Sequence, residues 1–99
     1  MSSRIPIDRE RIAAFCQQHH IRRLSLFGSV LTDQFNSESD VDVLVEFEPG
    51  QEPGLFAMSG MEIELTQMLG REVDLRTPME LSTYFREDVL REAEVQYAA

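Results

Sequence analysis

The sequence feature that most constrains the fold is a glycine–serine pair, Gly28-Ser29, followed after ten residues by Asp40-Val41-Asp42. The apolar run at residues 24–27 predicts a strand that stops at Gly28, where the absence of a side chain lets a ligand approach the backbone. Ser29 is a favourable cap for a helix that begins there, and the N–H groups at a helix N-terminus form a natural seat for phosphate. We therefore expect a phosphate-binding turn at Gly28 and Ser29.

Residues 41–47 alternate in the way that is typical of a β-strand with two different faces. Four apolar side chains share one face, while Asp42 shares the other with Asp40, Leu44 and Glu46. The rise of a strand puts the two aspartates roughly 6–7 Å apart along the chain, close enough to bind a shared pair of metal ions. A phosphate seat beside a pair of carboxylates indicates phosphoryl or nucleotidyl transfer.

A third carboxylate, Asp74, interrupts the apolar strand predicted at residues 72–76. Aspartate is disfavoured in strands and is costly to bury unpaired. If this strand lies beside the one before it, Asp40, Asp42 and Asp74 converge, and a cation between them relieves their repulsion. Oxygen ligands favour Mg²⁺ or Mn²⁺ over zinc, and two such ions can clamp the attacking and leaving oxygens of a displacement at phosphorus. Singly, each aspartate has a plainer interpretation as a cap or an exposed residue on an open sheet face.

The rest of the chain alternates between helical and strand-like patterns. Helices are expected at residues 8–19, with Asp8 as the cap, and at residues 55–69, stopped by Gly70. Residues 77–80 have the pattern of a helix start, so a short helix through Phe85 and a last helix at 87–95 are predicted. The side chains of the long helix expected in the core are Leu55, Met58, Ile63, Leu65, Met68 and Leu69.

Length and composition predict one globular domain, which we place at residues 1–99. A hydrophobic fraction of 42% is typical of a folded chain. No apolar run approaches the ~20 residues of a membrane span, and the first residues lack the apolar core of a signal peptide, so a cytoplasmic location is the default expectation. Cys16 is the single cysteine, which excludes an internal disulfide and a cysteine-based zinc site. We expect it to fill the core.

The charge of the chain bears on its partners. Eighteen acidic residues against nine basic ones give a net charge of −9. Proteins that bind nucleic acids usually display a basic face, whereas the longest basic cluster here is Arg22-Arg23. We therefore expect no direct binding to nucleic acid, and a basic protein partner or cations at the carboxylates fit the charge better.

The spacing of these motifs resembles the polymerase-beta-type nucleotidyltransferase superfamily. Gly28-Ser29, then Asp40-Val41-Asp42 after ten residues, then Val73-Asp74-Leu75 is similar in particular to the minimal nucleotidyltransferase (MNT) proteins of prokaryotes. The resemblance runs from about Ile21 to the C-terminus. It implies an α+β fold, a small mixed β-sheet flanked by helices. It also implies two Mg²⁺ ions, with Mn²⁺ as an alternative, and ATP as the substrate.

MNT proteins are typically encoded beside a HEPN-domain ribonuclease toxin. The resemblance therefore implies a cytoplasmic antitoxin that transfers AMP from ATP to a tyrosine of that toxin, in a complex that can be oligomeric. Carried over to this chain, Gly28 and Ser29 would hold the β- and γ-phosphates. Asp40 and Asp42 would bind both metals, and Asp74 would bind the catalytic metal and help deprotonate the incoming hydroxyl.

One departure from the family pattern leaves an alternative open. Many relatives carry basic residues shortly after Gly-Ser, where this chain has Val30-Leu31-Thr32-Asp33. The missing charge would come from Arg22, Arg23, Arg76 or the partner, or phosphate affinity would be lower. The alternative to an enzyme is a binding module of the same fold that neutralises its partner by direct contact. Transfer to a small molecule such as an antibiotic is disfavoured, since those enzymes usually need a further domain to hold the acceptor.

Overall fold

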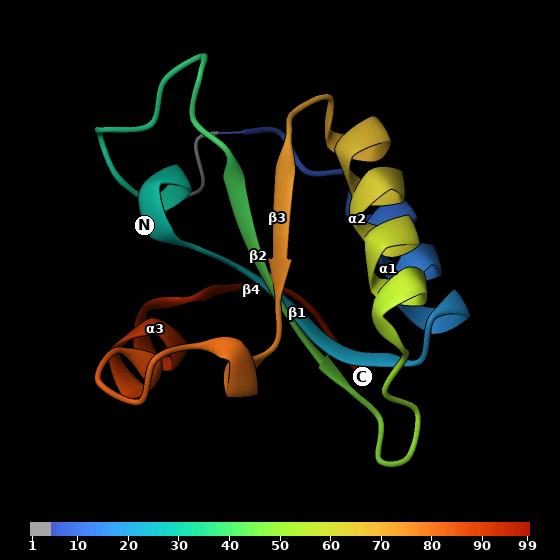
Figure 1. The fold of residues 1–99 in the computed structure, drawn as a ribbon. Helices are drawn as coiled ribbons and strands as arrows, with labels where there is room; N and C mark the ends of the chain where they lie inside the picture. Colours follow the sequence, from blue (N-terminus) through green and yellow to red (C-terminus); the bar gives the residue numbers. More distant parts are fainter. Residues whose placement is uncertain (1–4) are drawn as a thin grey trace.

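Four strands form one mixed β-sheet in the order β3-β2-β1-β4 (Figure 1). They are β1 (Ile21–Phe27), β2 (Val41–Phe47), β3 (Val73–Arg76) and β4 (Glu94–Ala98). β1 is antiparallel to both β2 and β4, whereas β2 and β3 run parallel. The computed structural model describes residues 5–99, so the first four residues of the predicted domain lie outside the described part. The predicted α+β class and mixed sheet are confirmed.

Helices lie on both sides of this sheet (Figure 1). The helices are α1 (Arg9–Gln18), α2 (Leu55–Leu69) and α3 (Arg86–Glu92). Of these helices, only α1 and α2 pack closely on the sheet. Two short 3-10 turns follow strands: η1 (Gly28–Leu31) after β1, and η2 (Pro78–Glu80) after β3. α1 and α2 lie together on one side of the sheet, and η1 and α3 lie on the other (Figure 1). Among residues 5–99, no helix has the length and apolar character needed to cross a bilayer.

The helix ends follow the sequence signals closely. Asp8 accepts hydrogen bonds from the backbone N–H groups of Glu10 and Arg11 at 3.1 and 3.3 Å, which satisfies donors that α1 leaves unpaired. Gly70 ends α2 in the left-handed conformation, with φ of 69°. The helix-start pattern predicted at residues 77–80 is present as a capping box between Thr77 and Glu80. These three local predictions are confirmed.

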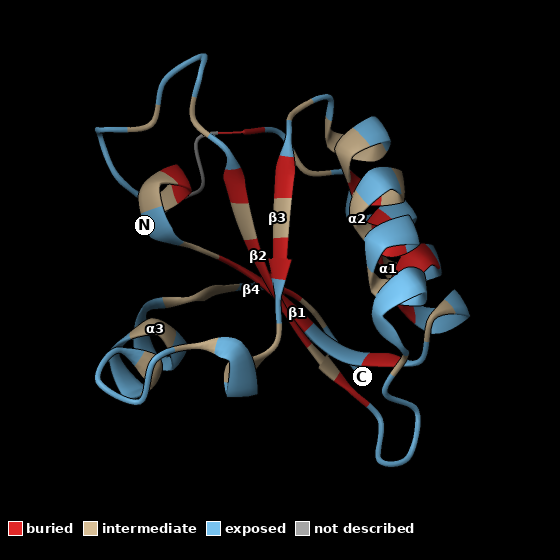
Figure 2. Ribbon diagram, in the orientation of Figure 1, coloured by how far each residue is buried: buried red, intermediate tan, exposed pale blue. Residues whose placement is uncertain are grey.

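The core lies between the sheet and the pair α1 and α2. Figure 2 shows buried residues in every strand, alternating with intermediate ones in β2 and β3, and exposed residues on the outer faces of both helices. The inner layer is apolar throughout, with Val41, Val43 and Val45 of β2 fully buried. Cys16 is buried in α1, as expected, and burial raises the pKa of its thiol to about 12. This thiol is therefore a packing group, because the reactive thiolate form is suppressed.

The predicted core face of α2 is partly wrong. Leu55 and Ile63 are 87% and 61% exposed, whereas Met61, which was not predicted in the core, is buried with Leu65. α2 packs on the edge strand β3, and a helix at the edge of a sheet buries only a narrow stripe of its surface. Met58 and the last turn of the helix are partly buried beside this stripe.

The C-terminal prediction is also wrong in two places. The helix expected through Phe85 is only the three-residue turn η2, and the last helix ends at Glu92 instead of residue 95. Arg86 donates to the carbonyls of Pro78 and Leu81 at 2.8 and 3.0 Å, so it satisfies acceptors that a longer helix would have paired internally. The remaining residues form β4, which pairs with the free edge of β1.

The outer edge of β3 is closed by side chains of α2. Thr66 accepts a hydrogen bond from the Val73 N–H at 3.1 Å, and Glu62 accepts one from the Leu75 N–H at 2.8 Å. These are the N–H groups that point away from β2. An edge strand with unpaired N–H groups is a template for unwanted strand pairing. α2 therefore both buries the sheet and blocks its edge.

Replacing Thr66 with valine should lower the free energy of unfolding by about 1–3 kcal/mol, because valine fills the same space but leaves the Val73 N–H without an acceptor. Urea denaturation measures the effect. Thr83 is exposed, so Thr83→Val controls for the change of residue type and should shift stability by less than about 0.5 kcal/mol. Equal stabilities of the two variants would show that the Thr66 hydrogen bond contributes nothing.

Candidate active site

Two of the predicted site residues lie side by side on β2 and β3. In the parallel pairing of these strands, Asp42 is directly opposite Asp74. Neighbouring strands are ~4.8 Å apart, and residues at paired positions share a face. Both aspartates are half-buried, and the residues before and after each are buried on the opposite, helix-covered face. The two carboxylates therefore share the face that α1 and α2 leave open.

Gly28 brings the predicted phosphate turn against one of these carboxylates. β1 pairs with β2 so that Phe27 lies opposite Asp42, and Gly28 follows at once with φ of +78°. A Cβ at this position would lie 2.3 Å from Oδ2 of Asp42. Only glycine fits here, because both the backbone conformation and the close approach exclude a side chain. The turn and the carboxylate are thus parts of one site.

Ser29 lies inside the turn and not at its cap. The cap of η1 is Phe27, with no side-chain hydrogen bond, so the prediction that Ser29 caps a helix is wrong. The reason is that Gly28, in its left-handed conformation, is already the first residue of the turn. The Ser29 carbonyl accepts from the N–H and the hydroxyl of Thr32, each at 2.9 Å. Within residues 5–99 the structure gives the Ser29 hydroxyl no hydrogen-bond partner, so it is available to a ligand.

Charge repulsion marks the centre of the site. Burial raises the pKa of the Asp42 carboxyl, and the negative charges of Asp74 and Asp40 raise it further, while Arg76 opposes them. Arg76 lies on the same face of β3 as Asp74, and the two form an ion pair at 3.1 Å. Asp40, directly before β2, acts on Asp42 through its charge. A cation bound here would remove the repulsion.

The chemistry of this site fits a hard divalent cation. Carboxylate oxygens are the ligands that Mg²⁺ and Mn²⁺ prefer, and Asp42 and Asp74, with Asp40 nearby, could hold such an ion. Among residues 5–99, no three His, Cys, Asp or Glu side chains lie close enough together to hold a metal ion in their present conformations. The fit therefore depends on the oxygen donors and on the repulsion at Asp42, and not on a completed coordination shell.

A second feature of the site was missed by the sequence analysis. A cavity of about 750 Å³ lies between η1 and the segment that leads into α3, and Gly28 is in its lining. Phe27, Leu31, Phe85 and Val89 make it largely apolar. No sequence signal placed α3 opposite η1, because that arrangement depends on the long-range pairing of β4 with β1. The cavity gives the site an apolar extension beside the phosphate turn.

A glycine turn against one carboxylate, with a second carboxylate beside it on a mixed sheet, is the arrangement expected of a nucleotidyltransferase. The sequence profile of the nucleotidyltransferase domain matches residues 9–95. The chain belongs to this family, and the resemblance to minimal nucleotidyltransferases is confirmed.

Two similar sequences carry more specific names. The chain is 32% identical over 85 residues to a predicted protein adenylyltransferase of Methanocaldococcus jannaschii, MJ0435, which covers 86% of this chain and 89% of that protein. It is 36% identical over 72 residues to the protein adenylyltransferase MntA of Thermococcus cleftensis, across 73% of this chain and 71% of that one.

Solved structures share the fold. A predicted minimal nucleotidyltransferase superposes with a TM-score of 0.71 at 36% identity, over 86% of this chain and 85% of that one. A toxin–antitoxin crystal structure with AMP-PNP gives a TM-score of 0.74 at 19% identity, over 94% and 75% of the two chains. A complex of the tri-AMPylated Shewanella oneidensis HEPN toxin with its MNT antitoxin gives 0.65 at 19% identity, over 92% and 70%. The last two show a common fold alone.

Proposed function

We propose that this chain is a metal-dependent protein adenylyltransferase that acts in the cytoplasm as the antitoxin of a toxin–antitoxin pair. It transfers AMP from ATP to a tyrosine of a partner HEPN-domain ribonuclease toxin and so neutralises it. The observation that carries the proposal is the in-register pair Asp42 and Asp74 beside the Gly28 turn. The names of the relatives, and the folds found in toxin–antitoxin complexes, support the same conclusion.

Each residue of the site has a role in this reaction. The Gly28 backbone and the Ser29 hydroxyl bind the β- and γ-phosphates, and the apolar cavity beside Gly28 suits the adenine ring. Asp40, Asp42 and Asp74 would hold Mg²⁺, which when bound neutralises phosphate charge and lowers the pKa of the acceptor hydroxyl. Arg76 fixes the Asp74 carboxylate through their ion pair.

The bond changes in this reaction follow from in-line displacement. The tyrosine oxygen attacks the α-phosphorus of ATP, and the bond from that phosphorus to the bridging oxygen breaks. Pyrophosphate leaves with the electron pair, and an oxygen of Asp74 accepts the hydroxyl proton. The fixed positions of turn and carboxylates supply most of the rate gain, because orientation and preorganised charge are the main resources of such a site.

The test combines the protein with ATP labelled at the α-phosphate, Mg²⁺ and the protein encoded by the neighbouring reading frame, which the proposal expects to be a HEPN protein. We expect label on the partner, located on a tyrosine by mass spectrometry, and loss of ribonuclease activity in parallel. Omitting Mg²⁺ should abolish the label. A partner that binds but is never labelled would contradict the adenylyltransferase assignment.

A second function, neutralisation by contact alone, is favoured by one observation. η1 and the two residues after it carry no basic side chain, with Val30-Leu31-Thr32-Asp33 following the Gly-Ser turn. Phosphate binding therefore lacks a cation that many relatives supply there. Inhibition of the ribonuclease by the unlabelled, ATP-free complex, to the same extent as with ATP, would identify this second function.

A further inference from the structure

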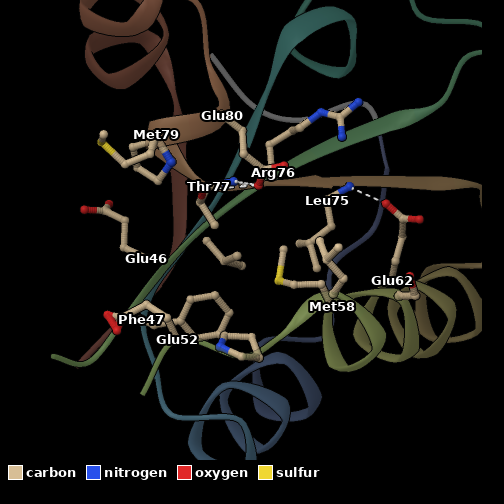
Figure 3. A pocket seen from close by; sticks show the side chains of 15 residues that line it. Glu46, Phe47, Glu52, Met58, Glu62, Leu75, Arg76, Thr77, Met79 and Glu80 are labelled. Carbon is tan, nitrogen blue, oxygen red and sulfur yellow. Dashed lines mark hydrogen bonds between the residues drawn. The ribbon is translucent and has the colours of Figure 1, made fainter. Parts of the chain in front are cut away.

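A groove of about 880 Å³ lies where the end of β2, the N-terminal half of α2 and the connection from β3 to η2 meet (Figure 3). This volume is within the ~300–1,000 Å³ range of ligand-binding pockets. Phe47, Met58 and Leu75 contribute apolar surface inside it. Leu55 and Met79 also line it while being 87% and 79% exposed. Large apolar side chains held out in water around a groove are typical of an interaction site.

Three glutamates of this groove have no basic partner. Glu62 accepts the hydrogen bond from the Leu75 N–H at 2.8 Å, and Glu80 accepts the one from the Thr77 N–H at 2.9 Å (Figure 3). Glu52 is exposed in the loop before α2. Across residues 5–99, no lysine, arginine or histidine forms an ion pair with Glu52, Glu62 or Glu80. Their three negative charges therefore surround the apolar surface without compensation.

The other charged residues of the lining are already paired. Arg76 lines the groove and forms an ion pair at 3.1 Å with Asp74, which does not line it. Glu46 lies 3.6 Å from Arg22 and 3.6 Å from Arg23. Because Arg76 and Glu46 are each paired with an opposite charge, the net charge of the groove comes from Glu52, Glu62 and Glu80. The groove combines an apolar interior with a net negative rim.

We propose that this groove is the docking site of a partner-protein segment in which an apolar side chain is flanked by lysine or arginine. The apolar interior takes the central side chain, and the glutamates take the flanking cations. Nucleic acid is excluded as the occupant because its phosphates would face three carboxylates, and a second copy of this chain carries −9 itself. The surface binds a basic, amphipathic protein segment.

The position of the groove connects it to the reaction. Arg76 lines the groove and also holds Asp74 through its ion pair, so the two sites share a residue. A docked segment would therefore lie beside the carboxylates. This inference rests on the proposed function in one respect, since the segment is taken to belong to the protein that accepts AMP. The groove sets which partner is presented, and the carboxylates perform the transfer.

The test compares two double variants of the full chain. Leu55→Ser with Glu52→Lys removes one apolar wall and reverses one charge of the groove. Ile63→Ser with Glu48→Lys makes the same changes at exposed positions of α2 and its preceding loop that do not line the groove. Affinity for the partner protein of the proposed function is measured by calorimetry at two salt concentrations. The groove variant should bind at least about tenfold more weakly, because it loses an apolar contact and reverses a charge that faces the basic segment.

Further readouts separate this inference from the proposed function. The groove variant should show a raised KM for the partner with kcat nearly unchanged, and wild-type binding should weaken with salt. Equal binding by the two double variants would overturn the docking site, even if transfer occurs. Self-association of the wild type that the groove variant loses would also overturn it, because the occupant would then be a second copy. Groove-dependent binding without any transfer would uphold the groove and refute the adenylyltransferase.

Discussion

Replacing Asp42 with asparagine should abolish adenylyl transfer and, without divalent cations, raise the melting temperature of the protein. Asparagine keeps the shape of the side chain but removes a charge that burial and two neighbouring carboxylates, Asp74 and Asp40, disfavour. Mutating a residue that only hydrogen-bonds to a metal ligand typically lowers metal affinity or activity by ~10–100-fold. Loss of a proposed ligand should therefore lower kcat by more than about 100-fold. The variant would be more stable and inactive, as expected for a residue retained for function.

The sign of the stability effect follows from the pKa direction. A carboxyl whose pKa is higher in the folded than in the unfolded chain holds its proton more tightly when folded. Its favourable contribution is present below the unfolded value, near the usual 3.8, and is lost as pH rises through the raised folded value. The gain in melting temperature of Asp42→Asn over wild type should therefore grow as pH rises from about 3.8 to the raised folded value, and should level off above that folded value. For a domain of this size, ~1 kcal/mol corresponds to roughly 4–8 °C.

Calorimetric melting with and without Mg²⁺ tests both halves of this prediction. Mg²⁺ should raise the melting temperature of the wild type but not of Asp42→Asn, because binding to the folded state alone is stabilising. Glu38→Gln, which removes one charge from an exposed loop, controls for the change in net charge and should leave transfer intact. Unchanged transfer in Asp42→Asn would refute the catalytic role of the carboxylates.

The placement of Asp42 and Asp74 on one face could be predicted because alternation in a strand is rigid. Once residues 41–47 and 72–76 are strands with apolar residues at every second position, the aspartates must share the opposite face. The helix α2 offers no such certainty. Its apolar residues, Leu55 and Ile63 included, surround much of the helix, and the stripe that is buried depends on where the sheet edge lies. The element against which a helix packs decides which of its faces is buried, and the sequence pattern of the helix does not identify that element.

The fourth strand could not be predicted from the sequence either, because it too depends on a partner that is distant along the chain. Residues 94–98 continue a charged helical segment, and they become β4 because the free edge of β1 supplies hydrogen bonds from some seventy residues away. The contact of Gly28 with Asp42 needs the register that pairs Phe27 with Asp42. Motif spacing indicates that such residues meet, while the register of the strands decides how closely.

Replacing Gly28 with alanine should reduce transfer by about 100-fold or more, although the protein still folds. The new Cβ would lie 2.3 Å from Oδ2 and 3.2 Å from Cγ of Asp42, so the carboxylate must rotate away from the turn. A displacement of ~1 Å at a reacting centre can cost ~10²-fold. Because the Asp42 side chain can rotate, the clash should change the geometry of the site more than it lowers the stability of the protein. The left-handed backbone of alanine adds a separate cost of ~1–2 kcal/mol.

Gly50 provides a matched control, since it has the same φ of +78° and nothing within 4 Å of its would-be Cβ. Gly50→Ala should lose a similar ~1–2 kcal/mol of unfolding free energy in urea but keep its kcat. The difference in activity between the two variants then measures the contact between turn and carboxylate, with the backbone strain cancelled. Equal rates of AMP transfer by Gly28→Ala and Gly50→Ala would show that transfer does not require the close approach of Asp42 to the Gly28 turn. The proposal that these two motifs form one active site would then be wrong.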